Sequence, residues 1–142
     1  MDGWLKTRRN RTGYKRVTTS DGTFLSGGTE IMSVDEVSFI VIVIGQESWN
    51  LGSWSWMLLR GKKNVITRII TTYFPTVGAI TGGAYSRKLE SLTMMKIQND
   101  PRTQFWIDLN TEILKWIHQG EQIILIGDWN SEASEVNTWM ET

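Results

Sequence analysis

The sequence predicts an α/β fold, a mixed β-sheet flanked by helices. A hairpin signal over residues 54–73 is followed by a helix signal over 101–118 and a strand signal over 122–130. This order of elements is typical of α/β architecture. A length of 142 residues, 40% hydrophobic and 21% charged, fits one domain. We expect a basic arm at residues 1–25, with one short strand at most, and a folded part at 26–142.

The composition narrows the choice of partners and metals. Fifteen basic and fifteen acidic residues cancel, so no overall field steers the chain to nucleic acid or membrane. The absence of cysteine excludes disulfides and thiolate metal sites, and oxygen ligands favour Mg²⁺ or Mn²⁺. The longest apolar run, 39–44, is too short to span a bilayer. We therefore expect an intracellular protein that does not enter membranes.

Basic residues are concentrated near the start of the chain. They form either a solvated arm or a set of phosphate contacts, and composition alone leaves both interpretations open. The residues concerned are Lys6, Arg8, Arg9, Arg11, Lys15 and Arg16.

Two strands are predicted before the hairpin. The Gly27-Gly28-Thr29 sequence indicates a tight turn that leads into a strand at 30–33. The run 37–44 is dense in β-branched residues and predicts a second strand. Glu47 follows it, and a carboxylate just past a buried strand is a candidate metal ligand.

The hairpin has arms at 54–60 and 65–73, joined by a turn at 61–64. Trp54 and Trp56 share one face of the first arm, which favours a packing role over ligand stacking. Pro75 must end the ladder because it lacks a backbone donor. Tyr73 therefore lies at the exit of a strand, either as a half-buried cap or as a donor to a phosphate.

Two helices are predicted after a glycine-rich loop at 78–83. The first covers about 85–97, with Tyr85, Leu89 and Leu92 at core spacing. The second begins at Asp100-Pro101, an N-cap acid before proline at the first helical position. It ends at Gly120, and its apolar stripe is Phe105, Leu109, Ile113, Trp116 and Ile117. His118, in its last turn, is better explained as a helix-end residue than as a catalyst.

The apolar run 123–126, which follows Gln122, predicts a strand buried on both faces. It ends at Gly127-Asp128-Trp129-Asn130, and α/β sheets place their chemistry just beyond such strand ends. If the chain stays extended, Asp128 and Asn130 point to the same side. The Asp128 carboxylate can accept a proton or hold a metal-bound water, and the Asn130 carboxamide can donate to an anionic oxygen. The same tetrapeptide is also ordinary turn chemistry.

These motifs resemble the endonuclease/exonuclease/phosphatase superfamily. The resemblance rests on Tyr73-Phe-Pro after a β-branched strand, then a helix, then Gly127-Asp128-Trp129-Asn130. Smaller matches resemble the endonuclease-like domains of protist retroelements and extend the similarity over about residues 27–132. They are Gly27-Gly28-Thr29, the 51–56 segment, Arg60-Gly61-Lys62, and Pro101-Arg102 followed by Gly120-Glu121-Gln122.

The resemblance implies phosphodiester or phosphomonoester hydrolysis with Mg²⁺ or Mn²⁺. Asp128 would orient or deprotonate the attacking water, Asn130 would bind the phosphate or that aspartate, and Tyr73 would support the phosphate. Nucleic acid, foremost DNA, would be the substrate. A nuclear location and a larger retroelement polyprotein as partner are further implications.

The family's upstream Asn and metal-binding Glu, and its late Asp-His pair, have no counterpart here. Glu47 follows a glutamine, as the family's Glu does, but it comes after the Gly-Gly strand instead of before it. We therefore assign it no metal role and expect it to lie far from Asp128. We expect the central part of such a sandwich, without its first and last strands, with exposed apolar faces and little activity of its own. A non-catalytic remnant that binds nucleic acid weakly is the alternative.

The resemblance also predicts a geometry. The strands ending at Tyr73 and Asp128 should lie side by side, with their carboxyl ends at one edge of the sheet. The 101–118 helix should cover one face of that sheet, with Phe105, Leu109, Ile113 and Trp116 turned inward.

Overall fold

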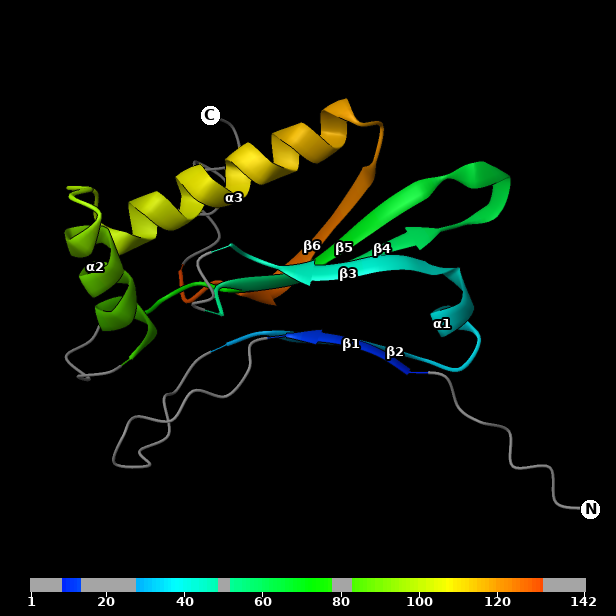
Figure 1. Cartoon of the computed structure of the whole chain (residues 1–142), viewed down its shortest axis with the longest axis horizontal. Coiled ribbons are helices and arrows are strands. Elements are labelled where there is room, and N and C mark those ends of the chain that lie inside the picture. Colours follow the sequence, from blue (N-terminus) through cyan, green and yellow to red (C-terminus); the bar gives the residue numbers. More distant parts are fainter. Residues whose placement is uncertain (1–8, 14–27, 49–51, 78–82, 132–142) are drawn as a thin grey trace, which may run out of the picture.

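A four-stranded mixed sheet forms the centre of the fold in the computed structural model, which describes residues 9–13, 28–48, 52–77 and 83–131 (Figure 1). The strand order is β3-β4-β5-β6. The first two pairs are antiparallel, and β5 and β6 are parallel. Strands β3, β5 and β6 therefore share one direction, and their carboxyl ends meet at one edge. The bounds are Val41–Gln46 for β3, Trp54–Arg60 for β4, Ile66–Tyr73 for β5 and Gln122–Asp128 for β6.

A two-stranded antiparallel ribbon lies against one face of this sheet as a second layer (Figure 1). It consists of β1, Arg9–Gly13, and β2, Glu30–Val34. The ribbon contacts β3 and β4, and the hydroxyl oxygens of Thr29 and Ser55 lie 2.9 Å apart across the two layers. The one short strand allowed within residues 1–25 is therefore present as β1.

Helix α3, Pro101–His118, covers the opposite face of the sheet (Figure 1). Phe105, Leu109 and Trp116 are buried and Ile113 is partly buried against the same core, so the predicted stripe is confirmed at these four positions. Trp54 and Trp56 both lie on this face, as predicted. Helix α2, Ala84–Met94, packs beside α3. The core consists of Trp54, Ile70, Phe74, Phe105, Trp106, Leu109 and Trp116.

The start of α3 has the predicted cap. Asp100 accepts hydrogen bonds from the amides of Arg102 at 2.9 Å and Thr103 at 3.2 Å, and the hydroxyl of Tyr85 donates to it at 2.7 Å. Burial acts to raise the pKa of Asp100, but these hydrogen bonds prevail, and its pKa lies below the ordinary 3.8. The hydrogen bond to Asp100 holds the pKa of Tyr85 above 10.0. The helix ends before Gly120, whose φ is +81°.

The strand predicted over 37–44 is wrong in its first half. Val37–Ile40 forms a short helix, α1, and the strand begins only at Val41. The preceding Asp35 has a positive φ of 50°, and its carbonyl accepts from the amide of Ser38 at 3.0 Å. Strands β2 and β3 belong to different layers, so the chain has to turn here. A helical turn makes that connection despite the β-branched sequence.

Three predicted burials are also wrong. Strand β6 is covered on one face only: Ile124 and Ile126 are 48% and 51% exposed, because the β1–β2 ribbon covers β3 and β4. Ile117 is exposed because Trp116 takes the position facing the sheet and the next residue lies about 100° further round the helix. Leu89 is exposed because α2 turns Lys88 and Leu92 inward.

A buried ion pair lies near the first residues of β5 and β6, at the end of the sheet opposite Tyr73. The guanidinium of Arg68 on β5 donates to both oxygens of the Glu121 carboxylate, at 2.6 and 2.9 Å. It also lies 4.0 Å from the ring centre of Trp56 and 4.1 Å from that of Trp116. The pair therefore joins β5 to the start of β6 and to the end of α3.

The predicted α/β fold class is confirmed at the level of a mixed sheet with helices. No helix in the described ranges is long and apolar enough to cross a membrane.

Candidate functional site

Tyr73 and Asp128 lie side by side at the carboxyl edge of the sheet. They are partners in the parallel ladder between β5 and β6, so the predicted adjacency of these strand ends is confirmed. Partner residues in a ladder project from the same face, and neighbours along a strand alternate. Phe74 belongs to the core beneath α3, so Tyr73 and Asp128 project from the other face. Asp128 is exposed and Tyr73 is half-buried.

Asn130 takes a different position from the one predicted. Strand β6 ends at Asp128, and Asn130 has a positive φ of 45°, so the chain does not stay extended. The amide nitrogen of the Asn130 side chain donates to the Phe74 carbonyl at 2.8 Å. Its backbone N–H donates to the Asp128 carboxylate at 3.2 Å, and the N–H of Phe74 donates to the Asp128 carbonyl at 2.9 Å. Asn130 therefore joins the two strand exits.

Trp129 anchors the motif from the opposite side. Its ring stacks on that of Trp106 in α3, with centres 5.3 Å apart and planes 4° from parallel. The aromatic residue therefore packs against the core while the preceding carboxylate faces solvent. This arrangement gives the tetrapeptide both a turn role and an exposed acid, the two interpretations that the sequence left open.

Arg102 is a charged neighbour of the site, and the sequence predicted no role for it there. It lies in the first turn of α3, its guanidinium is 4.4 Å from the ring centre of Phe74, and it donates to the hydroxyl of Ser131. Arg102 thus braces the chain that follows Asn130. The available signal was its position directly after the proline that begins α3, since that end of the helix has to meet the sheet edge.

Glu47 lies at the same carboxyl edge as Asp128 but next to the outer strand on the other side, β3. It follows β3, and β3 and β6 are the outer strands of the four, so β4 and β5 separate it from Asp128. At about 4.8 Å per strand the separation is roughly 14 Å. The side chain is 4% exposed and accepts from the amide of Gly52 at 2.9 Å. This separation agrees with the expectation that Glu47 is no partner of Asp128.

The described residues do not by themselves fit a bound metal ion. Over 9–13, 28–48, 52–77 and 83–131 there is no group of three or more His, Cys, Asp or Glu side chains that could hold one. His118 lies at the other end of α3, where its Nδ1 is 2.7 Å from the Leu114 carbonyl oxygen. Among the described residues, Asp128 therefore offers a single carboxylate at this edge, with Tyr73 as its ladder partner, and we derive no catalytic step through a metal.

No family model, curated protein or solved structure matches this chain. Tyr73 and Asp128 are therefore marked as a candidate site by their pairing at one sheet edge and by the motif resemblance.

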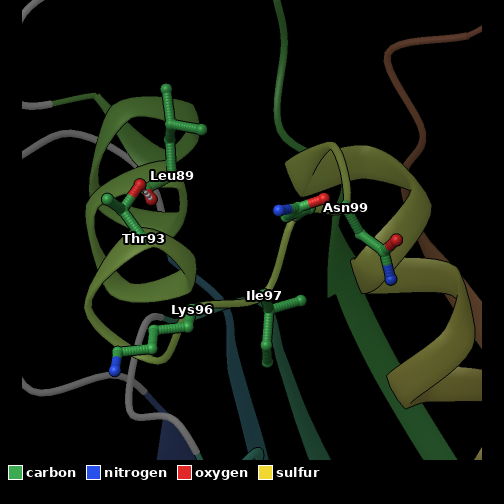
Figure 2. Close-up of a pocket in the computed structure, with 6 residues that line it drawn as sticks. Leu89, Thr93, Lys96, Ile97 and Asn99 are labelled. Atoms are coloured by element: carbon green, nitrogen blue, oxygen red, sulfur yellow. Dashed lines mark hydrogen bonds between the residues drawn. The ribbon is translucent and has the colours of Figure 1, made fainter.

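Among the described residues, two surface hollows lie away from Tyr73 and Asp128. One, of about 450 Å³, is formed where the end of α2 faces the approach to α3. Figure 2 shows Leu89 and Thr93 of α2 on one side of it and Asn99 on the other. The second, of about 310 Å³, is an apolar groove between α3 and Leu125 of β6. Neither is lined by Tyr73 or Asp128.

Proposed function

We propose that this chain is part of a phosphodiesterase of the endonuclease/exonuclease/phosphatase type that cleaves nucleic acid and comes from a retroelement. The observation that carries the proposal is the in-register pairing of Tyr73 with Asp128 at one sheet edge. The same pairing would be expected if the two motifs belonged to one active site. The exposed Asp128 carboxylate is free of the core and accessible to a substrate.

The chemistry assigned to these residues is limited to what their positions allow. Asp128 accepts a proton from an attacking water, and the hydroxyl of Tyr73 donates to a phosphoryl oxygen. Asn130 acts through Asp128, because its side chain is bound to the Phe74 carbonyl and its backbone N–H to the carboxylate. This positioning role replaces direct phosphate binding as the main task that we propose for Asn130.

Mg²⁺ or Mn²⁺ remains part of the proposal, with most of its ligands supplied from outside the described residues. The exposed side chains of Ile124 and Ile126 support this, because they leave the face beside Tyr73 and Asp128 apolar and uncovered within the described fold. Further polypeptide packed on that face, as in a complete sandwich, would bring its own side chains close to Asp128. We therefore expect the 142-residue chain alone to cleave little or nothing.

A plasmid-nicking assay with Mg²⁺ tests this function. The 142-residue chain is compared with a longer chain that includes its flanking coding sequence, each with and without Asp128→Ala. We expect nicking by the longer chain only, abolished by Asp128→Ala and retained in Glu90→Ala, which removes an exposed carboxylate from α2. Nicking that survives Asp128→Ala would refute the assigned role.

The alternative function is a non-catalytic module that binds nucleic acid through the basic residues near its start. Arg9 and Arg11 belong to β1, whereas Lys6, Arg8, Lys15 and Arg16 lie outside the described residues. Because β1 pairs with β2, deleting the first sixteen residues would damage the fold as well as remove charge. Substitution of these basic residues by glutamine is the better test. Binding by the longer chain without cleavage would favour this alternative.

A further inference from the structure

The tip of the β4–β5 hairpin is an exposed basic cluster. Arg60 ends β4, and Lys62 and Lys63 lie in the short 3-10 helix Lys62–Asn64 that connects to β5. All three are exposed. No ion pair within the described part of the chain involves any of them. Figure 1 shows the turn projecting beyond the rest of the sheet. We call these three residues the basic tip.

The start of β1 lies at the same end of the molecule. Arg9 pairs with Val34 at the end of β2, α1 then leads to Val41, and Val41 pairs with Leu59 next to the basic tip. The pairing therefore places the first residue of β1 and the basic tip at one end of the fold.

Among the described residues, no acidic side chain at this end forms an ion pair with the basic tip. Glu121 is committed to Arg68 by two hydrogen bonds. Asp35 and Glu36 are exposed in the turn before α1, on the side of the outer strand β3. Three unpaired cations within four residues of a hairpin favour an anion with repeated charges over a single carboxylate.

The distance between the basic tip and Asp128 indicates the size of that anion. Strand β5 has 8 residues, from Ile66 near the tip to Tyr73 beside Asp128. At about 3.3 Å per residue the two ends are roughly 23 Å apart. One strand of a duplex advances about 3.4 Å per nucleotide, so the gap corresponds to about seven nucleotides. A small phosphoester cannot reach both ends, whereas a nucleic acid can.

We propose that the basic tip is a docking surface for the phosphate backbone of a nucleic acid whose scissile phosphate lies at the Tyr73–Asp128 edge. The distance argument rests on the proposed function, but docking itself requires no hydrolysis. The contact carries charge and no base recognition. DNA and RNA offer the same chemistry, and separate duplexes in the test distinguish them.

Two lysines in the same backbone conformation provide a matched test. Lys63 has a φ of 57° and Lys96, at the end of α2, a φ of 60°, and both side chains are exposed. Lys96 lines the hollow in Figure 2, which α2 forms away from the hairpin. Asparagine tolerates such angles, so Lys63→Asn and Lys96→Asn each remove one charge with equal backbone strain.

Binding is measured by fluorescence anisotropy with labelled 20-bp DNA and RNA duplexes, without divalent metal, between 50 and 200 mM salt. We expect Lys63→Asn to lower the slope of log affinity against log salt by about one, and affinity near 0.1 M salt by roughly tenfold. Arg60→Gln with Lys62→Gln and Lys63→Asn should lower the slope by two to three. Lys96→Asn should leave it unchanged.

Several outcomes would overturn the proposal. These are equal effects of Lys63→Asn and Lys96→Asn, equal affinity for a hairpin with a 4-bp stem and for a 20-bp duplex, or tighter binding of phosphatidylserine vesicles than of either nucleic acid. Circular dichroism of each variant checks that the fold is retained. If the tip variants lower affinity as expected and the longer chain never cleaves, docking stands and the hydrolase proposal fails; if cleavage occurs without any effect of the tip variants, the reverse holds.

Discussion

The buried ion pair between Arg68 and Glu121 gives the sharpest test of the packing. The side chains are 5% and 8% exposed, and Nη1 of Arg68 is buried without a hydrogen-bond partner among the described residues. Glu121→Gln removes the carboxylate charge but keeps the shape. The guanidinium then remains buried between Trp56 and Trp116 with no counter-charge. Breaking one partner of a buried pair costs about 3 to 5 kcal/mol.

Urea unfolding at 25 °C measures this cost. With a slope of about 1.5 kcal/mol per molar, a loss of 3 kcal/mol lowers the urea midpoint by roughly 2 M. Lys115→Gln is the control, because the ion pair of Lys115 with Glu112 is long, at 3.7 Å, and largely exposed. Its loss should cost no more than about 0.5 kcal/mol.

A double replacement separates burial of charge from packing. Arg68→Met with Glu121→Leu removes both charges, which on its own is neutral or stabilising by about 1 to 4 kcal/mol. It also removes two cation–π contacts, each contributing about 0.5 to 2 kcal/mol. We expect the double variant to lie within about 1 kcal/mol of the parent. A cost below about 1 kcal/mol for Glu121→Gln, or equal costs for the single and double variants, would refute this description of the pair.

Three further predictions concern the sheet edge and the start of α3. A Cβ at Gly127 would lie 2.2 Å from the Thr72 carbonyl oxygen, so Gly127→Ala should lower the free energy of unfolding by about 2 to 3 kcal/mol. Gly120 has open space around it, so the control Gly120→Ala should lower it by about 1 kcal/mol, from the positive φ alone. The pKa of Asp100 is lowered in the folded state, so the stability that its carboxylate contributes is present above the ordinary pKa of 3.8 and is lost as pH falls through the folded pKa. Asp100→Asn keeps the cap but does not titrate. In unfolding curves from pH 6 to pH 2, its free energy of unfolding should therefore fall less with pH than that of the parent chain. Asp128 is exposed, so Asp128→Ala should change the unfolding free energy by less than about 0.5 kcal/mol, and a larger loss would show that the residue is structural.

Strong local signals made much of the fold predictable. The Asp100-Pro101 start, the Gly120 stop and the arms of the β4–β5 hairpin could be read from capping, turn and alternation patterns, and all are present. The failures arise where a residue's surroundings come from distant parts of the chain. Ile124 and Ile126 lie on the face of the sheet that the β1–β2 ribbon covers at β3 and β4, but the ribbon does not cover β6. No local sequence pattern indicates how far the ribbon extends over the sheet.

The candidate site was also predictable only in part: the adjacency of Tyr73 and Asp128 was, and the conformation of Asn130 was not. The motif resemblance implied that Tyr73 and Asp128 would be neighbours, and the parallel pairing confirms it. The conformation of Asn130 was not predictable, because it depends on the carbonyl of Phe74, 56 residues away. The bracing of Ser131 by Arg102 is likewise a contact between distant segments.

The pairing of β5 with β6 determines at which stage of folding the candidate site forms. The two strands are remote in sequence: the hydroxyl of Thr72 donates to the Ile126 carbonyl, 54 residues away. The β4–β5 hairpin and α3 are local and can form first, whereas β6 closes a long loop and should dock last. Opening of β6 alone would separate Tyr73 from Asp128 while leaving the hairpin intact. In native-state hydrogen exchange we therefore expect the β6 amides to exchange sooner than those shared by β4 and β5.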